Sequence, residues 1–154
     1  MKKTIYISGS ITDPQTNQPR DGWQKDFLEA EAQLRAKGFN VINPIDIAQE
    51  VEDWFMWRHF EHFLGPQQFG KPSSPTRTDY IMACLQRMKM AHDADMLHGV
   101  YVIGKDTEPL DSIGVNMELH MATLLGIPIY YKDLEHVIYL KKTQYADITE
   151  LFKE

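Results

Sequence analysis

The most constraining feature of the sequence is the β-helix-β pattern with which it opens. An apolar, β-rich run at residues 4–8 (TIYIS) predicts a strand that begins almost at the first residue. Apolar side chains then recur at helical spacing over residues 23–37, and Gly38 ends that pattern. A second β-rich run at residues 39–43 is stopped by Pro44. A helical crossover of this length suits two parallel strands, so the chain is predicted to adopt an α/β fold.

Strands and helices continue to alternate through the rest of the chain. This alternation predicts a three-layer α/β/α sandwich around a parallel sheet. The remaining predicted elements are a helix to about Asp93 capped by Thr78 or Asp79, a strand at 96–103, a helix to Leu125 capped by Asp111 or Ser112, a strand at 127–131, a candidate strand at 137–140 and a candidate helix at 148–153.

One stretch interrupts the alternation. Residues 45–63 are acidic and rich in aromatic side chains, and they predict one or two short helices. Residues 64–77 hold three prolines and two glycines, which predicts a loop. We therefore expect a single domain over residues 1–154 with an irregular helical and loop insertion at about 49–77.

Composition narrows the classes of function. The net charge of −6 disfavours a nucleic-acid polymer as partner, because proteins that bind one are usually basic. The sequence lacks a signal-peptide core and any apolar stretch approaching about 18 residues, so we expect no membrane association. The single cysteine, Cys84, excludes an internal disulfide and fits a reducing compartment, which favours a cytoplasmic protein. The histidines form no HExxH motif or clustered ligand set, so no metal site is expected.

The carboxyl ends of the predicted strands mark the expected ligand site. In an open parallel sheet, ligands bind outside these ends, where the strand order reverses. Gly9, Ser10 and Ile11 follow the first strand, residues 43–46 follow the second, and residues 104–114 follow the third. Small residues such as Gly9 and Ser10 let backbone N–H groups approach a phosphate or a sugar. We expect these three segments to converge on one crevice.

Glu118 stands out on the helix that precedes the fourth strand. With Ile113 set to zero and about 100° per residue, Glu118 falls at about 140°, between Leu125 at about 120° and Ala122 at about 180°. It is therefore the one charged residue on an otherwise apolar face. A glutamate is almost never buried without a partner or a purpose. The position is compatible with a functional carboxylate, with a buried structural ion pair, or with a partly exposed residue at the edge of the face.

Several short segments together resemble the nucleoside 2-deoxyribosyltransferase family and its relatives. The last and most distinctive fits the signature (Asp or Ser)-x-Gly-x-x-x-Glu, which ends in the nucleophilic glutamate of that family. The resemblance covers roughly residues 1–48 and 78–131, and the second part also resembles less characterised, often phage-borne relatives. The segments are residues 2–6 (KKTIY) followed by Gly9, residues 44–46 (PID), residues 95–101 (DMLHGVY), residues 112–119 (SIGVNMEL), Ala122 and residues 126–128 (GIP).

The resemblance implies a fold and a set of roles. It implies a flavodoxin-like parallel sheet of about five strands, no metal and no cofactor, and homo-oligomers in which a neighbouring chain completes the site. Glu118 would be the nucleophile, and Tyr6 would orient it by a hydrogen bond. The implied substrates are small-molecule nucleosides or nucleotides. The residues implied to bind them are Ser10 and Ser112 at the 5′ group, Gly9 and Gly114 where the backbone approaches the ligand, and Asp46, Asp93 and Asp95 at the base or sugar.

Three positions depart from the family pattern. The transferases carry an aspartate eight residues before the one that opens the third strand, and counting back from Asp95 gives Arg87, which cannot give a proton to a base. Ser112 stands where transferases often have aspartate. A serine at this position resembles the relatives that hydrolyse deoxynucleoside 5′-monophosphates. The arginine that those relatives carry after Gly-Ser-Ile is Thr12 here.

The sequence therefore leaves three functions open. In the first, a carboxylate below the anomeric carbon stabilises or captures an oxocarbenium-like sugar, and a second base completes a deoxyribosyl transfer. In the second, water attacks instead and the enzyme is an N-glycoside hydrolase. In the third, the chain is a binding module that holds a nucleotide without cleaving it.

Overall fold

Five parallel strands form the sheet of this protein. The computed structural model describes residues 2–11, 16, 19–63, 75–103, 113–131 and 145–153. Within them the strand order is β2-β1-β3-β4-β5, and every neighbouring pair is parallel. This is the flavodoxin-like order, with the switch point between β1 and β3. The strands are β1 (Thr4–Gly9), β2 (Asn40–Ile42), β3 (Gly99–Ile103), β4 (Ile129–Tyr131) and β5 (Tyr145–Asp147).

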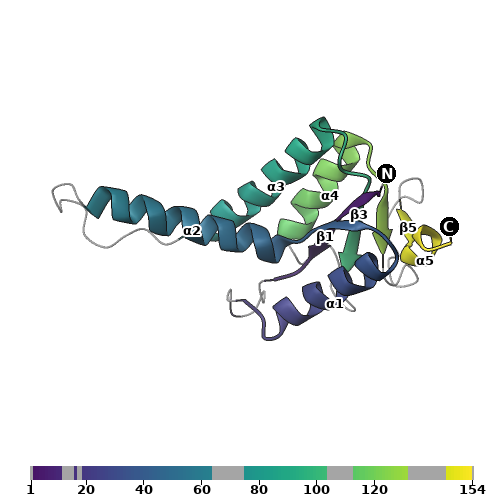
Figure 1. Ribbon diagram of the computed structural model, residues 1–154, viewed down its shortest axis with the longest axis horizontal. Helices are drawn as coiled ribbons and strands as arrows, with labels where there is room; N and C mark the ends of the chain where they lie inside the picture. The colour runs from purple at the N-terminus through teal and green to yellow at the C-terminus, as the bar shows by residue number, and fades with distance from the viewer. Residues whose placement is uncertain are drawn as a thin grey trace.

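Helices cover both faces of the sheet (Figure 1). Helices α1 and α5 pack on one face, whereas α3 and α4 pack on the other. The predicted three-layer α/β/α sandwich is therefore confirmed. None of the helices described combines the length and apolar character needed to cross a membrane. The helices are α1 (Trp23–Ala36), α2 (Pro44–Phe63), α3 (Arg77–Asp93), α4 (Ile113–Leu125) and α5 (Ile148–Leu151).

The pleat of β1 decides which side chains meet α4. Successive strand residues point to opposite faces. Ile5 and Ile7 accordingly join the core beneath α1, and Tyr6 joins the core beneath α3 and α4. Ser8 lies two residues after Tyr6 and shares its face. Two polar side chains of the central strand are thus buried on the side of the sheet that carries α4.

Helix α2 corrects the prediction for residues 45–63. One helix runs from Pro44 to Phe63 and, in Figure 1, extends well beyond the edge of the sheet. The predicted insertion at 49–77 is therefore regular helix as far as Phe63, and residues 64–74 lie outside the described part. The overlooked signal was Asn43-Pro44, because asparagine favours the N-cap and proline the first helical position.

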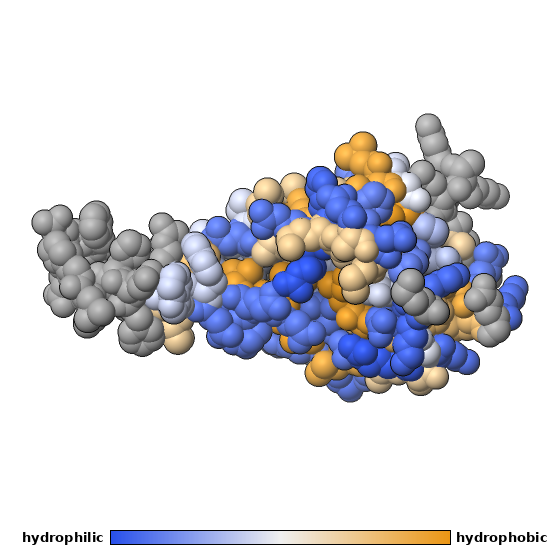
Figure 2. Space-filling view, turned by 45° about the horizontal axis from the view of Figure 1, so that its top comes forward, coloured by the Kyte–Doolittle hydropathy of each residue, from blue (hydrophilic) through white to orange (hydrophobic). Residues whose placement is uncertain are grey.

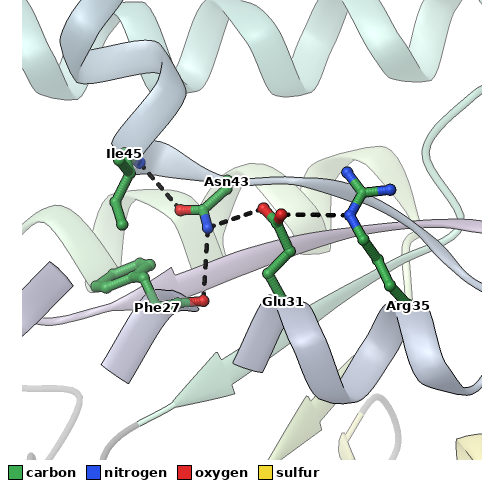
Figure 3. A network of polar contacts seen from close by, with 5 residues as sticks. All are labelled: Phe27, Glu31, Arg35, Asn43 and Ile45. Atoms are coloured by element: carbon green, nitrogen blue, oxygen red, sulfur yellow. Dashed lines mark hydrogen bonds and ion pairs between the residues drawn. The ribbon is translucent and has the colours of Figure 1, made fainter. Parts of the chain in front are cut away.

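Buried Asn43 fixes the start of α2 against α1 (Figure 3). Its Oδ1 accepts a hydrogen bond from the backbone N–H of Ile45 at 3.0 Å. Its Nδ2 donates to Glu31 Oε1 at 3.1 Å and to the backbone carbonyl of Phe27 at 3.5 Å. Glu31 in turn accepts from Arg35 at 3.2 Å. One amide therefore caps α2 and joins it to α1, which sets the direction in which α2 leaves the sheet.

Replacing Asn43 with alanine should destabilise the protein by about 2–3 kcal/mol, because the cap of α2 is lost and buried acceptors on α1 lose their donor. Urea denaturation monitored by circular dichroism measures this change. Asn40→Ala is the matched control, because Asn40 is exposed on β2. Equal denaturation midpoints for the two variants would contradict the anchoring role of Asn43.

Other predicted boundaries need smaller corrections. Strand β3 begins at Gly99 rather than Met96, because the chain leaves α3 through Asp95 in a left-handed conformation (φ 58°). The N-cap of α3 is Thr76, which forms a reciprocal capping box with Asp79. The predicted strand at 137–140 lies outside the described residues, and the fifth strand described is β5.

Candidate active site

A pocket of about 400 Å³ opens at the carboxyl end of β1. Its size falls in the range usual for small-molecule sites. The pocket lies beside the switch point of the sheet, where α/β folds of this kind bind ligands. It is lined by Gly9, Ile11, Pro19, Trp23, Pro44, Ala48, Glu52, Pro75, Arg77, Tyr80, Ile81, Cys84, Gly114 and Glu118.

Glu118 is the only charged side chain among the buried residues that the structure describes. It is 7% exposed and lies on the face of α4 that carries Val115, Leu119 and Ala122. The helical-wheel prediction of a carboxylate within the apolar face is therefore confirmed. The same residue lines the pocket, so its carboxyl group borders the space that a ligand would fill.

Three buried oxygen atoms near one another lack a hydrogen-bond partner among the described residues. They are Glu118 Oε2, the Tyr6 hydroxyl and the Ser8 hydroxyl. The hydroxyls of Tyr6 and Ser8 both lie close enough to the Glu118 carboxyl group to lower its pKa, and the orienting role of Tyr6 stays a prediction. Leaving buried polar atoms unpaired costs about 1–3 kcal/mol each. Of the three residues, Glu118 lines the pocket, so a polar ligand group that contacted its carboxyl group would recover part of that cost.

Burial governs the charge of this cluster. It raises the pKa of Glu118 to about 8, and the nearby hydroxyls of Tyr6 and Ser8 only partly oppose the increase. Burial, followed by the charge of Glu118, raises the pKa of Tyr6 well above its ordinary value. The same two causes raise the pKa of the Cys84 thiol to about 12. At neutral pH all three groups are therefore predominantly protonated.

Cys84 belongs to both the core and the pocket. The sequence analysis omitted it from the site, and its burial in the core beneath α3 and α4 agrees with a packing role. Cys84 also lines the pocket next to Tyr6 and Glu118. Because its thiol is held neutral, it acts there as a small apolar wall rather than as a nucleophile.

The predicted segments after β1 and β2 reach the pocket only in part. Gly9 and Ile11 line it, whereas buried Ser10 between them does not. Asp46 is exposed and lies on the opposite side of α2 from Pro44 and Ala48, both of which line the pocket. Asp46 therefore does not line this pocket, and its contact with a ligand stays a prediction from the resemblance.

Glycine serves different purposes at its two pocket positions. A Cβ atom on Gly9 would lie 2.7 Å from Ile103 Cγ1 and 3.1 Å from Phe27 Cζ, so the strand end packs too tightly for a side chain. A Cβ atom on Gly114 would make an ordinary 3.7 Å contact with Ile81 Cγ1. Gly9 is thus required by packing, and only Gly114 leaves room that a ligand could use.

Asp93 and Asp95 lie away from the pocket. Both are exposed and precede β3, so they lie near the amino ends of the strands, opposite to the carboxyl end of β1. Asp93 pairs with Lys89 and with His92 instead. Neither aspartate therefore lines this pocket, which opens at the carboxyl ends of the strands, and their contact with a base or sugar stays a prediction from the resemblance. Ser112 lies outside the described residues.

The structure adds four polar or aromatic residues that the sequence analysis did not select. Trp23 comes from α1, Glu52 from α2, and Arg77 and Tyr80 from α3, and all four line the pocket. The Tyr80 hydroxyl donates a hydrogen bond to Glu52 Oε1 at 3.1 Å. The pocket is therefore lined both by a buried carboxyl group on α4 and by a hydrogen-bonded polar pair on α2 and α3.

Within the part of the chain that the structure describes, no three His, Cys, Asp or Glu side chains gather as metal ligands. A scan against known protein families found no matching family model, and a search of curated proteins found no significant relative.

Proposed function

We propose that this protein cleaves the N-glycosidic bond of deoxynucleosides or nucleotides and transfers the deoxyribosyl group through Glu118. The observation that carries the proposal is the buried carboxyl group of Glu118, which has an unpaired oxygen and lines a pocket of nucleoside size. The resemblance of residues 112–119 to the family signature supports the same residue independently.

The proposed chemistry begins with the ionised carboxylate of Glu118. One of its oxygens attacks the anomeric carbon, the carbon–nitrogen bond breaks, and its electron pair leaves with the base, which takes up a proton. A second base or water then attacks the anomeric carbon and releases Glu118. Tyr6 and Ser8, whose hydroxyls lie close enough to Glu118 to lower its pKa, would donate hydrogen bonds that orient the carboxylate.

The rate of cleavage should rise with pH up to about 8. The nucleophile must be ionised, and a pKa of about 8 leaves about 1% of Glu118 ionised at pH 6 and about 10% at pH 7. We expect kcat/KM with a deoxynucleoside and a free acceptor base to rise about tenfold from pH 6 to pH 7 and to level off above 8. A fall above pH 8 would instead assign Glu118 the role of general acid.

The same assay separates transfer from hydrolysis. A new deoxynucleoside that contains the acceptor base identifies transfer, and free deoxyribose identifies attack by water. A non-catalytic nucleotide-binding module is the second candidate, and it is favoured by the neutral state of Glu118 at pH 7. Tight nucleoside binding without release of base over hours would support that candidate and would contradict cleavage.

The proposal includes a homo-oligomer that acts in the cytoplasm. Apolar side chains surface as separate patches on the largely hydrophilic face in Figure 2. Trp54, Met56 and Trp57 of α2 and Met82 and Met90 of α3 are exposed. A two-fold pairing of α2 and α3 with the same helices of a second copy would cover these apolar side chains, and a solution mass of one chain would contradict it.

A further inference from the structure

The pocket holds a second carboxylate besides Glu118. Glu52 of α2 lines it together with Tyr80 of α3, and the Tyr80 hydroxyl donates to Glu52 Oε1 at 3.1 Å. Among the described lining residues, Glu52 and Glu118 are the only acidic ones. Glu52 lies outside the ranges that resemble the transferase family, and Tyr80 lies within the second range but in none of its motif segments.

Helical spacing places Glu52 and Tyr80 about one helical turn away from the buried carboxyl group of Glu118. Pro44, Ala48 and Glu52 recur every four residues along one face of α2. Tyr80 and Cys84 are likewise four residues apart on α3, so they are separated by about 6 Å along the helix axis. Cys84 lies against Glu118, which sets the inner end of the pocket. The offset is comparable to the span between the sugar and the far edge of a nucleobase.

The other acidic residues of this region are already engaged. The carboxylate of Asp79 accepts from the backbone and hydroxyl of Thr76, which lowers its pKa. Glu50 pairs with Arg87, the residue that replaces the family aspartate, and both line a separate groove between α2 and α3. Glu52 is therefore the described carboxylate best placed to meet the far end of a ligand that contacts Glu118.

We propose that Glu52 and Tyr80 bind the edge of the nucleobase and select bases that carry an amino group beside a ring nitrogen. This inference rests on the proposed function. The amino N–H groups would donate to the Glu52 carboxylate, and the Tyr80 hydroxyl would turn to donate to the ring nitrogen. A base with a carbonyl in place of the amino group sets an oxygen against the carboxylate and loses binding.

Two pairs of probes isolate this difference. Deoxyadenosine and deoxyinosine, and deoxycytidine and deoxyuridine, differ by an amino group in place of a carbonyl and by the adjacent ring nitrogen, which accepts a hydrogen bond in the amino member and carries a hydrogen in the carbonyl member. We expect the wild-type protein to bind the amino member of each pair about tenfold more tightly in calorimetric titrations. Glu52→Gln should reduce that ratio to about one or reverse it, since the amide can donate to a carbonyl. Tyr80→Phe should weaken binding of both amino members.

Glu50→Gln is the matched control, because it changes a carboxylate on the same helix that faces the separate groove. It should keep the wild-type ratio, and Glu118→Gln should keep it while losing turnover. Equal binding within each wild-type pair, or an unchanged ratio in Glu52→Gln, would overturn the inference and leave the proposed function standing. Failure of the wild-type protein to bind any of the four probes would overturn both. Glu52 is exposed, so its variant is expected to fold.

Discussion

Replacing Glu118 with glutamine or alanine is expected to lower the rate of glycosidic-bond cleavage by at least about a thousandfold, which corresponds to about 4 kcal/mol of transition-state stabilisation. Neither side chain can bond to the anomeric carbon or neutralise a developing positive charge on the sugar. Glutamine keeps the shape of glutamate, so its loss of rate reports the missing charge rather than a cavity. Release of free base from a deoxynucleoside, followed by chromatography, measures the effect.

Glu29→Gln is the control for this experiment, because Glu29 is an exposed carboxylate on α1, outside the residues that line the pocket. It should retain the full rate. Nucleoside binding should survive in Glu118→Gln, since the apolar walls and the Glu52–Tyr80 pair remain. A Glu118→Ala protein that cleaves as fast as wild type would remove Glu118 from the mechanism.

Glu118→Gln should be more stable than the wild-type protein at alkaline pH. The folded-state pKa of Glu118 is raised to about 8 from an ordinary value of 4.5. The contribution of protonated Glu118 to the free energy of unfolding is therefore fully present below about pH 4.5. It declines as pH rises and is lost by about pH 8. Between pH 5 and pH 8 the wild-type protein should lose on the order of 3 kcal/mol that Glu118→Gln does not lose.

Urea denaturation at pH 5, 6.5 and 8 measures this difference. The two proteins should have similar unfolding free energies at pH 5, and the gap between them should widen toward pH 8. Glu29→Gln should follow wild type throughout. Cys84 does not contribute in this range, because an exposed thiol ionises only near pH 9. Parallel pH dependences for wild type and Glu118→Gln would mean that Glu118 is ionised at little cost in the folded state.

The fold could be predicted because its elements are local. The runs at residues 4–8 and 39–43 and the helical spacing between them are sufficient for a parallel β-helix-β unit. Glu118 could be found for the same reason, because one helical wheel shows a carboxylate among Val115, Leu119 and Ala122. In both cases the residues that form the pattern lie close together in the sequence, within one strand or a few turns of one helix.

The outer half of the pocket could not be predicted because it depends on tertiary placement. Glu52 and Tyr80 are 28 residues apart and meet where α2 packs against α3. Asp93 and Asp95 precede β3, so they lie at the amino ends of the parallel strands, away from the carboxyl ends where the pocket opens. Their assignment to the ligand rests on the family resemblance alone. Asp46 does not line the pocket because residues two apart on a helix lie on opposite sides of it.

Different elements of the chain carry the two groups proposed to contact the sugar and the base. The carboxyl group that would act on the sugar is held in the core by α4 and β1, whereas the pair that would read the base sits on the exposed surfaces of α2 and α3. Surface substitutions generally cost little stability. Under the proposed function, substitutions on α2 and α3 should change the range of nucleosides accepted while the buried carboxyl group of Glu118 stays unchanged, so laboratory selection for new nucleoside products should target these two helices first.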